Sequence, residues 1–184
     1  MRELILGGAR SGKSTLAEQR ARDSGLDVTY IATAEAGDDE MRERIEHHRE
    51  RRPDHWRTIE APHALAATLT REAAADRLLL VDCLTLWLGN WIDDADGLAR
   101  ERAALLEALP SLPGTIVLVS NEVGLGIVPA HALARRFRDE AGRLNQDVAA
   151  ACERVTFVAA GLPLTPEGTR ERVIPDAVPG RRNR

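Results

Sequence analysis

The sequence predicts an α/β sandwich built on a mostly parallel sheet. Two observations lead to this class: short apolar runs alternate with longer segments of helical pattern, and the apolar runs are continuous. Continuous runs suit strands that are buried on both faces, as they are in a parallel sheet. The alternation of the two kinds of segment is typical of α/β proteins.

The predicted elements follow in order along the chain. Strands are expected at Leu4–Leu6, Asp27–Thr33, Arg77–Asp82, Thr115–Ser120 and Val155–Ala159. Helices are expected at Ser14–Arg22, Asp38–Arg52, His63–Ala75, Leu98–Leu109 and Pro129–Arg154. In the last helix, Pro129 suits a first-turn position. An apolar stripe along that helix is assigned to the core: Leu133, Phe137, Leu144 and Val148.

Length and composition limit the possible classes of protein. A chain of 184 residues predicts one domain, expected over 1–164, with a loosely ordered tail over 165–184. The apolar runs are far shorter than the ~20 residues of a membrane span. Two distant cysteines argue against a disulfide scaffold or a cysteine zinc site and fit a reducing cytoplasm. A net charge of −4 and few aromatic residues argue against a nucleic-acid partner.

A phosphate-binding loop follows the first predicted strand. The pattern G-x-x-x-x-G-K-[ST] is matched by Gly7, Gly8, Ala9, Arg10, Ser11, Gly12, Lys13 and Ser14. Its glycines let backbone N–H groups surround an anion, and the following helix adds its positive end. Lys13 can reach β- and γ-phosphate oxygens, and the Ser14 hydroxyl can bind Mg²⁺. Lys13 is also the single lysine of a chain with 24 arginines, at a position where arginine would substitute poorly.

Asp82 ends a predicted strand, which is the expected place for a second Mg²⁺-side carboxylate. Asp82 could also cap the following apolar segment, Leu84–Ile92, and both roles are compatible. That segment suits core, a subunit contact or a substrate-facing surface, and we favour core or interface. A signalling GTPase is disfavoured because the sole lysine lies in the phosphate loop, which leaves none for a guanine-reading Asn-Lys-x-Asp motif. Among P-loop proteins, a small-molecule kinase remains.

A charged segment carries two adjacent histidines. On the helix predicted for Asp38–Arg52, acids lie at the start and arginines at the end, as the helix dipole prefers. Met41 and Ile45 define its apolar face. At 100° per residue His48 falls near that face and suits packing, whereas His47 points away and suits chemistry. A solvated charged helix explains the same pattern.

Several blocks together resemble a known family. They are the loop at 7–14, Tyr30–Ala34, Asp38–Met41 with the His-His pair, Arg52–Thr58, Val81–Thr85, Ser120–Pro129, and Ala134–Asp139 with Gly142–Gln146. In order and spacing, over about residues 3–164, they resemble the bifunctional adenosylcobinamide kinase / adenosylcobinamide-phosphate guanylyltransferase of cobalamin biosynthesis. The resemblance implies a P-loop NTPase fold of the RecA-like kind, a three-layer sandwich with a mostly parallel central sheet.

The resemblance also implies chemistry and site residues. The family phosphorylates adenosylcobinamide with ATP or GTP, then transfers GMP from GTP through a guanylyl-histidine, which maps to His47, and releases pyrophosphate. Lys13 would act in catalysis, and Ser14 and Asp82 would hold Mg²⁺. Further nucleotide contacts are implied at Ala32, Thr33, Ala34, His48, Arg49, Glu50, Arg51, Glu60 and Asp82. A cytoplasmic homo-oligomer, a trimer in the family, with adenosylcobinamide and its phosphate as substrates is expected.

Other residues and other functions stay open at this stage. Asn121 and Glu122 end a predicted strand at the edge where α/β proteins bind ligands. Gly124 and Gly126 fit either close backbone approach to a ligand or a bare turn, and His55 and Trp56 fit either the site or packing. The competing functions are a P-loop kinase without the nucleotidyl step and a nucleotide-binding module without turnover.

Overall fold

The computed structural model describes residues 1–35, 37, 42, 46 and 52–164. Its elements, in chain order, are β1 (Arg2–Gly7), α1 (Lys13–Asp23), β2 (Asp27–Ala32), β3 (Arg57–Glu60), α3 (Leu65–Glu72), β4 (Arg77–Asp82), α4 (Leu84–Asn90), α5 (Ala95–Ala108), η1 (Leu109–Ser111), β5 (Thr115–Asn121), α6 (Ala132–Ala151), β6 (Arg154–Ala159) and β7 (Leu162–Leu164). The predicted tail at 165–184 lies outside the described residues, as does most of the helix predicted for Asp38–Arg52. Within that segment Arg42 and Glu46 are helical, and Arg52 is a bend.

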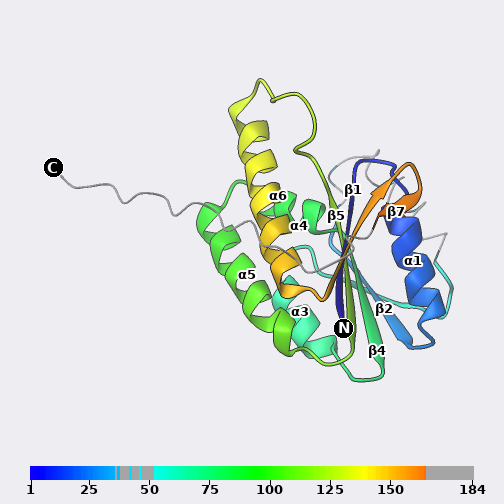
Figure 1. Ribbon diagram of the computed structural model, residues 1–184. Helices are drawn as coiled ribbons and strands as arrows, with labels where there is room; N and C mark the ends of the chain where they lie inside the picture. Colours follow the sequence, from blue (N-terminus) through cyan, green and yellow to red (C-terminus); the bar gives the residue numbers. More distant parts are fainter. Residues whose placement is uncertain (36, 38–41, 43–45, 47–51, 165–184) are drawn as a thin grey trace.

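The described strands form one seven-stranded sheet in the order β3-β2-β4-β5-β1-β6-β7. All neighbours pair in parallel except β6 and β7, which are antiparallel. Figure 1 shows α1 on one face of the sheet and α3, α4, α5 and α6 on the other. The fold is therefore the predicted three-layer α/β sandwich with a mostly parallel sheet.

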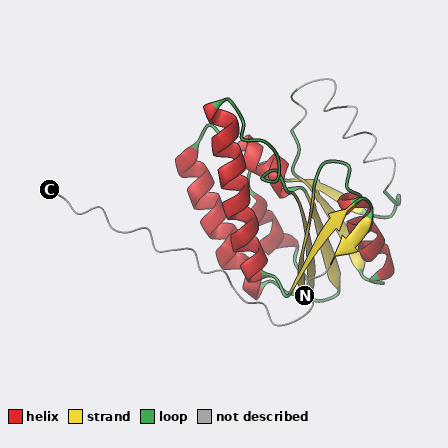
Figure 2. Ribbon diagram, turned by 45° about the horizontal axis from the view of Figure 1, so that its top comes forward, coloured by secondary structure: helices red, strands yellow, loops and turns green. Residues whose placement is uncertain are grey.

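Each face of the sheet has its own hydrophobic core. On the α1 face, Ala17 and Ala21 pack with Ile5, Tyr30 and Trp56. The other face is larger, and its core includes Leu4, Leu65, Leu84, Trp87, Leu98 and Leu144. The continuous apolar strands are explained by this arrangement, because successive side chains of one strand enter opposite cores. Figure 2 shows the two helical layers from a second direction.

The five predicted strands are all present, and each is matched to within a few residues. Two further strands were not predicted. β3 reads RTIE and is mostly exposed, so it has no apolar run that would mark it, and β7 is three residues long with a central proline. Both lie at edges of the sheet, where neither hydrophobicity nor length is required.

Helix α6 corrects two predictions. It begins at Ala132, so Pro129 lies outside the helix and not in its first turn. Leu144 and Val148 are buried as predicted, but Leu133 is 53% exposed and is not core. The first turn of α6 extends beyond the layer below it, whereas the later turns cover the sheet and α5. The helix predicted for His63–Ala75 is likewise shorter, because α3 spans Leu65–Glu72.

Part of the apolar segment after Asp82 lies in the core, as one of the two favoured interpretations predicts. Leu84, Trp87 and Leu88 on α4 have no exposed area, and the Trp87 indole Nε1 donates to the His63 carbonyl oxygen at 2.9 Å. No described helix is both long enough and apolar enough to cross a bilayer.

Candidate active site

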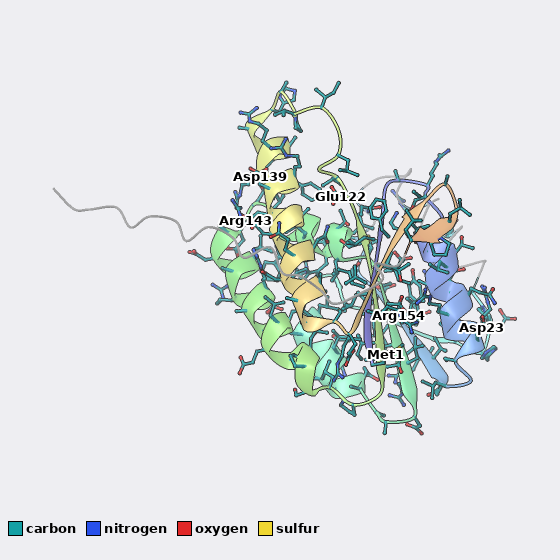
Figure 3. The ribbon with its side chains drawn as sticks, in the orientation of Figure 1. Met1, Asp23, Glu122, Asp139, Arg143 and Arg154 are labelled. Atoms are coloured by element: carbon teal, nitrogen blue, oxygen red, sulfur yellow. The ribbon has the colours of Figure 1, made fainter. Side chains whose placement is uncertain are left out.

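The carboxyl ends of four adjacent parallel strands, β2, β4, β5 and β1, meet at one edge of the sheet. Ala32 pairs with Asp82 at the ends of β2 and β4, and Gly7 pairs with Asn121 at the ends of β1 and β5. Glu122 marks this edge in Figure 3, at the opposite end of the sheet from Met1 and Arg154. The topology therefore places most of the predicted site residues that the structure describes at one edge of the sheet. This edge is the usual ligand site of open α/β sheets.

The phosphate loop has the expected backbone. Gly12 has a φ of +97° and Arg10 a φ of +55°, both in the left-handed region that lets the chain turn tightly around its own N–H groups. A Cβ on Gly7 would lie 2.4 Å from Ser11 Oγ and 2.5 Å from the Val158 carbonyl oxygen. Gly7 therefore has to be glycine, and α1 begins directly after the loop at Lys13.

Lys13 folds back over this loop. Its Nζ donates to the Gly8 carbonyl oxygen at 3.1 Å, and the residue is 8% exposed. Burial lowers the pKa of the Lys13 ammonium below 10.5, and the neighbouring Cys83 and Asp82 oppose that shift. The ammonium is thus partly desolvated and close to the end of β4. Its attraction to an anion is stronger there than in bulk water. Ser11 Oγ is buried beside it without a hydrogen-bond partner, which suits a phosphate oxygen.

Asp82 is held between β2 and the phosphate loop. Burial raises the pKa of the Tyr30 phenol well above 10.0, and Asp82 adds to the shift by its charge and by a hydrogen bond. The Arg52 guanidinium lies 3.4 Å above the centre of the Tyr30 ring, and its Nε is buried without a hydrogen-bond partner. The N-cap of α4 is Cys83, with no side-chain capping bond, so Asp82 does not take the capping position.

Thr33 has a structural role at this edge. Its buried Oγ1 donates to the Cys83 carbonyl oxygen at 2.7 Å and accepts from the Cys83 N–H at 2.8 Å. The Asn90 amide then donates to the carbonyl oxygens of Thr33 at 2.8 Å and Pro62 at 2.9 Å. The Thr33 hydroxyl is thus occupied in fixing Cys83, next to Asp82, while the Thr33 backbone, where a nucleotide contact is also predicted, stays at the edge. No sequence signal singled out Asn90.

The end of β5 is fixed from both neighbouring helices. The Asn121 N–H donates to Thr85 Oγ1 at 2.7 Å, and Asn145 Nδ2 donates to the Asn121 carbonyl oxygen at 3.3 Å. Gly124 donates its N–H to Glu122 Oε1, and Trp56 is buried in the α1-side core. His55 is exposed.

The remaining predicted residues divide into two groups. Glu60 ends the edge strand β3 and is exposed, beside Ala32 in register, while Ala34 is half-buried after β2. The predicted nucleophile and the residues after it lie outside the described residues: His47, His48, Arg49, Glu50 and Arg51.

The donors at this edge fit a hard divalent cation. Ser14 opens α1 and Asp82 ends β4, and both offer oxygen, which Mg²⁺ prefers. Among the described residues no cluster of three or more His, Cys, Asp or Glu side chains could form an all-protein cage. Two oxygen donors with the remaining positions filled by water and phosphate are typical of Mg²⁺ sites that bind nucleotides.

Together, the fold and the phosphate loop define a nucleotide-binding P-loop protein of the RecA-like class. A solved RadB recombinase has the same fold, with a TM-score of 0.50 over 85% of this chain and 73% of that one, at 17% sequence identity. At this identity the likeness shows the fold alone.

The family follows from sequence. The family model described as cobinamide kinase / cobinamide phosphate guanyltransferase matches residues 3–165, and the chain belongs to this family. It is 65% identical over 170 residues to the bifunctional adenosylcobalamin biosynthesis protein CobP of Pseudomonas aeruginosa, covering 91% of this chain and 98% of the relative. It is 44% identical over 174 residues to the bifunctional adenosylcobalamin biosynthesis protein CobU of Escherichia coli, covering 86% and 96%.

Proposed function

We propose that the chain catalyses two successive steps of cobalamin biosynthesis. In the first, it phosphorylates the aminopropanol hydroxyl of adenosylcobinamide with ATP or GTP. In the second, it transfers GMP from GTP to that phosphate, giving adenosylcobinamide-GDP and pyrophosphate. The observation that carries the proposal is the match of nearly the whole chain to a bifunctional family, combined with an intact phosphate loop at the site edge.

In the kinase step, the phosphate loop binds the nucleotide. Its N–H groups and the first turn of α1 surround the phosphates, and Lys13 stabilises the charge that develops on the transferred group. Ser14 and Asp82 would hold Mg²⁺, which would neutralise negative charge on the phosphates. Tyr30 holds Asp82 through a hydrogen bond, and Thr33 fixes the neighbouring Cys83.

In the second step, His47 acts as the nucleophile. Its neutral imidazole nitrogen forms a bond to the α-phosphorus of GTP while the bond to the β-phosphate bridging oxygen breaks, and the electron pair leaves with pyrophosphate. The phosphate of the corrinoid then displaces the imidazole and takes GMP. The cations near this position neutralise charge: Arg49 and Arg51 by sequence, and Arg52, whose guanidinium lies on the Tyr30 ring. The other nucleotide contacts are assigned to Ala32, Thr33, Ala34, His48, Glu50 and Glu60.

The cellular setting belongs to the same proposal. The chain acts in the cytoplasm as a homo-oligomer, a trimer, with adenosylcobinamide and its phosphate as small-molecule substrates and no nucleic-acid partner. Size-exclusion chromatography with light scattering tests the assembly, and a monomer mass at working concentrations would contradict it.

Labelled GTP tests the reaction and the nucleophile together. Incubation with GTP labelled at the α-phosphorus should give protein-bound label that is labile in acid and stable in alkali. The label should be absent from His47→Asn and retained in His131→Asn, the same change at an exposed histidine before α6. Label that persists in His47→Asn would remove His47 from the role.

Product analysis separates the competing functions. Incubation with adenosylcobinamide and each nucleoside triphosphate should yield first the phosphate and then the GDP derivative. Formation of the phosphate alone would indicate a kinase without the nucleotidyl step. Nucleotide binding with neither product would indicate a module without turnover.

A further inference from the structure

Asn121 occupies a special place among the strand ends. β5 lies between β4, which carries Asp82, and β1, which leads into the phosphate loop. Asn121 pairs with Gly7, the first residue of the loop, and Asp82 pairs with Val119, two residues before Asn121. The end of β5 is therefore the part of the backbone between the loop and the Mg²⁺-side carboxylate.

The side chain of Asn121 lies on the α1 face of the sheet, the face of the helix that begins at Lys13. Val117 and Val119 lie in the core on the α1 face, and alternation along the strand places Asn121 on that same face. Its Nδ2 lies 3.9 Å from the Cys83 Sγ, and Cys83 is close enough to Lys13 to oppose the lowering of its pKa. The Asn121 amide thus contacts a thiol whose residue directly follows Asp82.

The amide of Asn121 is not committed to the fold. A thiol is a weak acceptor, and 3.9 Å is a long contact. Asn90 and Asn145, the other asparagines near this edge, donate instead to backbone carbonyl oxygens at 2.8–3.3 Å. Asn121 is thereby distinguished, among these described residues, as the one whose amide nitrogen lacks a strong acceptor.

The backbone of Asn121, in contrast, is held firmly. Thr85 on α4 accepts from its N–H, Asn145 on α6 donates to its carbonyl oxygen, and the next residue donates its N–H to the Gly7 carbonyl oxygen at 3.0 Å. A buried hydroxyl pair, Thr85 with Ser120 at 3.3 Å, reinforces this arrangement. A rigid backbone with an uncommitted amide is the arrangement expected of a preorganised hydrogen-bond donor.

We propose that Asn121 donates a hydrogen bond from its side-chain amide to the terminal phosphate of the bound nucleoside triphosphate. The proposal rests on the nucleotide binding in the proposed function and adds a residue to it. Lys13, at the start of α1, and Asn121, at the end of β5, would approach the γ-phosphate from two sides, while the loop holds the α- and β-phosphates. A diphosphate lacks the group that Asn121 contacts, so Asn121 would distinguish triphosphate from diphosphate.

Binding of two analogues tests this without turnover. The α,β-methylene analogues of GTP and GDP cannot be cleaved between their α- and β-phosphates. Calorimetric titration with Mg²⁺ present therefore measures the affinity of each analogue alone. In Asn121→Asp a carboxylate of the same shape replaces the donor and repels phosphate. The triphosphate analogue should bind roughly 10- to 100-fold more weakly, since hydrogen bonds to charged groups are of that strength. The diphosphate analogue should change by less than about threefold.

Matched variants keep the result interpretable. Gln146→Glu makes the same amide-to-carboxylate change on an exposed position of α6 and should leave both affinities unchanged. Asn121→Ser is uncharged, is too short to reach the phosphate, and carries the test if Asn121→Asp does not fold; it should also lose triphosphate affinity selectively. A triphosphate-to-diphosphate ratio within twofold of wild type in folded variants overturns the proposal, as does an equal loss for both analogues.

The outcome is independent of the cobinamide reaction. If wild-type protein made no cobinamide product but Asn121→Asp lost triphosphate affinity selectively, the role of Asn121 would stand and the proposed function would fail. If products formed normally in Asn121→Asp and the affinity ratio were unchanged, the proposed function would stand and the role of Asn121 would fail.

Discussion

Lys13 combines two properties at one residue, partial burial and the only ammonium side chain of the chain. The loop leaves its Nζ bonded to a carbonyl oxygen, a neutral partner that a phosphate can replace. We expect Lys13→Ala to lower the kinase rate by about 10²-fold or more, the size typical of a preorganised charge at the reacting group. Lys13→Arg should fail to restore the rate, because a planar guanidinium does not fit a site shaped for a compact ammonium.

Steady-state kinase assays with adenosylcobinamide measure this effect. Circular dichroism of each variant controls for folding. A kinase rate in Lys13→Ala within a few-fold of wild type would show that the phosphate loop binds nucleotide without acting in the transfer.

Thr33 stabilises the active-site edge through a single buried hydroxyl. Thr33→Val keeps the shape but leaves the buried Cys83 N–H without its partner, while the Cys83 carbonyl oxygen keeps only its bond from the Trp87 N–H at 3.1 Å. We expect a loss of about 2 kcal/mol in the free energy of unfolding, the typical cost of unsatisfied buried polar groups. Thr33→Ser retains the hydroxyl and should keep most of that stability. Urea unfolding measures both, and equal stability of the Val and Ser variants would show that the two hydrogen bonds contribute little.

At the scale of elements, the start of α5 comes from local chemistry that the sequence carries. Helix α5 begins where Asp94 accepts from the Gly97 N–H at 2.9 Å, with Asp94 as the N-cap. Asp94→Ala should cost about 1 kcal/mol, the usual value for a lost N-cap. That cost lowers the Tm by roughly 2–4 °C in a chain of this size. Asp93→Ala, at the preceding exposed residue, should leave the Tm unchanged, and equal melting of all three proteins would contradict the capping role.

The elements also show which parts of the fold a sequence can predict. Buried strands such as β4 and β5 were predicted because burial on both faces requires an unbroken apolar run. The edge strand β3 was missed because its backbone pairs on one side only and its side chains face water. Leu133 was wrongly assigned to the core because helical periodicity marks one face of α6 along its whole length. The first turn of α6, which carries Leu133, is exposed, and only the later turns are buried against the core.

The candidate site likewise has one part that the sequence predicts and another that it does not. The phosphate loop was predictable because its backbone path requires glycine at Gly7 and Gly12 and its chemistry requires Lys13. The supporting residues were not, since Asn90 and Asn145 act through carbonyl oxygens of residues far away in the sequence. Thr33 was predicted at the site, but its hydroxyl serves Cys83. Contacts between distant segments depend on the packing of helices over the strand ends, which no local pattern encodes.

At the scale of the whole molecule, the two ends of the sheet have different roles. The carboxyl end carries the phosphate loop, Asp82 and Asn121. The amino end carries buried ion pairs: Glu3 on β1 is fully buried and accepts from Thr156 Oγ1 at 2.8 Å and from the Arg20 guanidinium. Figure 3 shows Met1 and Arg154 at this end. The buried Glu3 carboxylate and its partners are thus separated, by the length of the strands, from the groups that must be free to bind substrate.

Glu72 at the end of α3 gives the stability of the whole fold a pH dependence. Its carboxylate accepts from Arg71 Nε and Arg57 Nη1, both at 2.8 Å, and so ties α3 to the edge strand β3. The hydrogen bond from Arg71, with further contributions from Arg57, lowers the pKa of Glu72 below 4.5 despite the opposing effect of burial. A pKa lowered by folding adds stability that is complete above the unfolded value and is lost as the pH falls through the folded value.

Glu72→Gln should therefore lower the Tm by a few degrees at pH 7, where the wild-type carboxylate is ionised. Below pH 4.5 the difference between the two proteins should shrink as the wild-type carboxylate takes up its proton. Thermal unfolding at a series of pH values from 7 to about 3 measures this, since ordinary carboxyl groups titrate within that range. Glu107→Gln, the same change on the exposed face of α5, should run parallel to wild type throughout. A constant difference between Glu72→Gln and wild type at all pH values would mean that Glu72 acts by packing, because only the ionised carboxylate gains from its arginine partners.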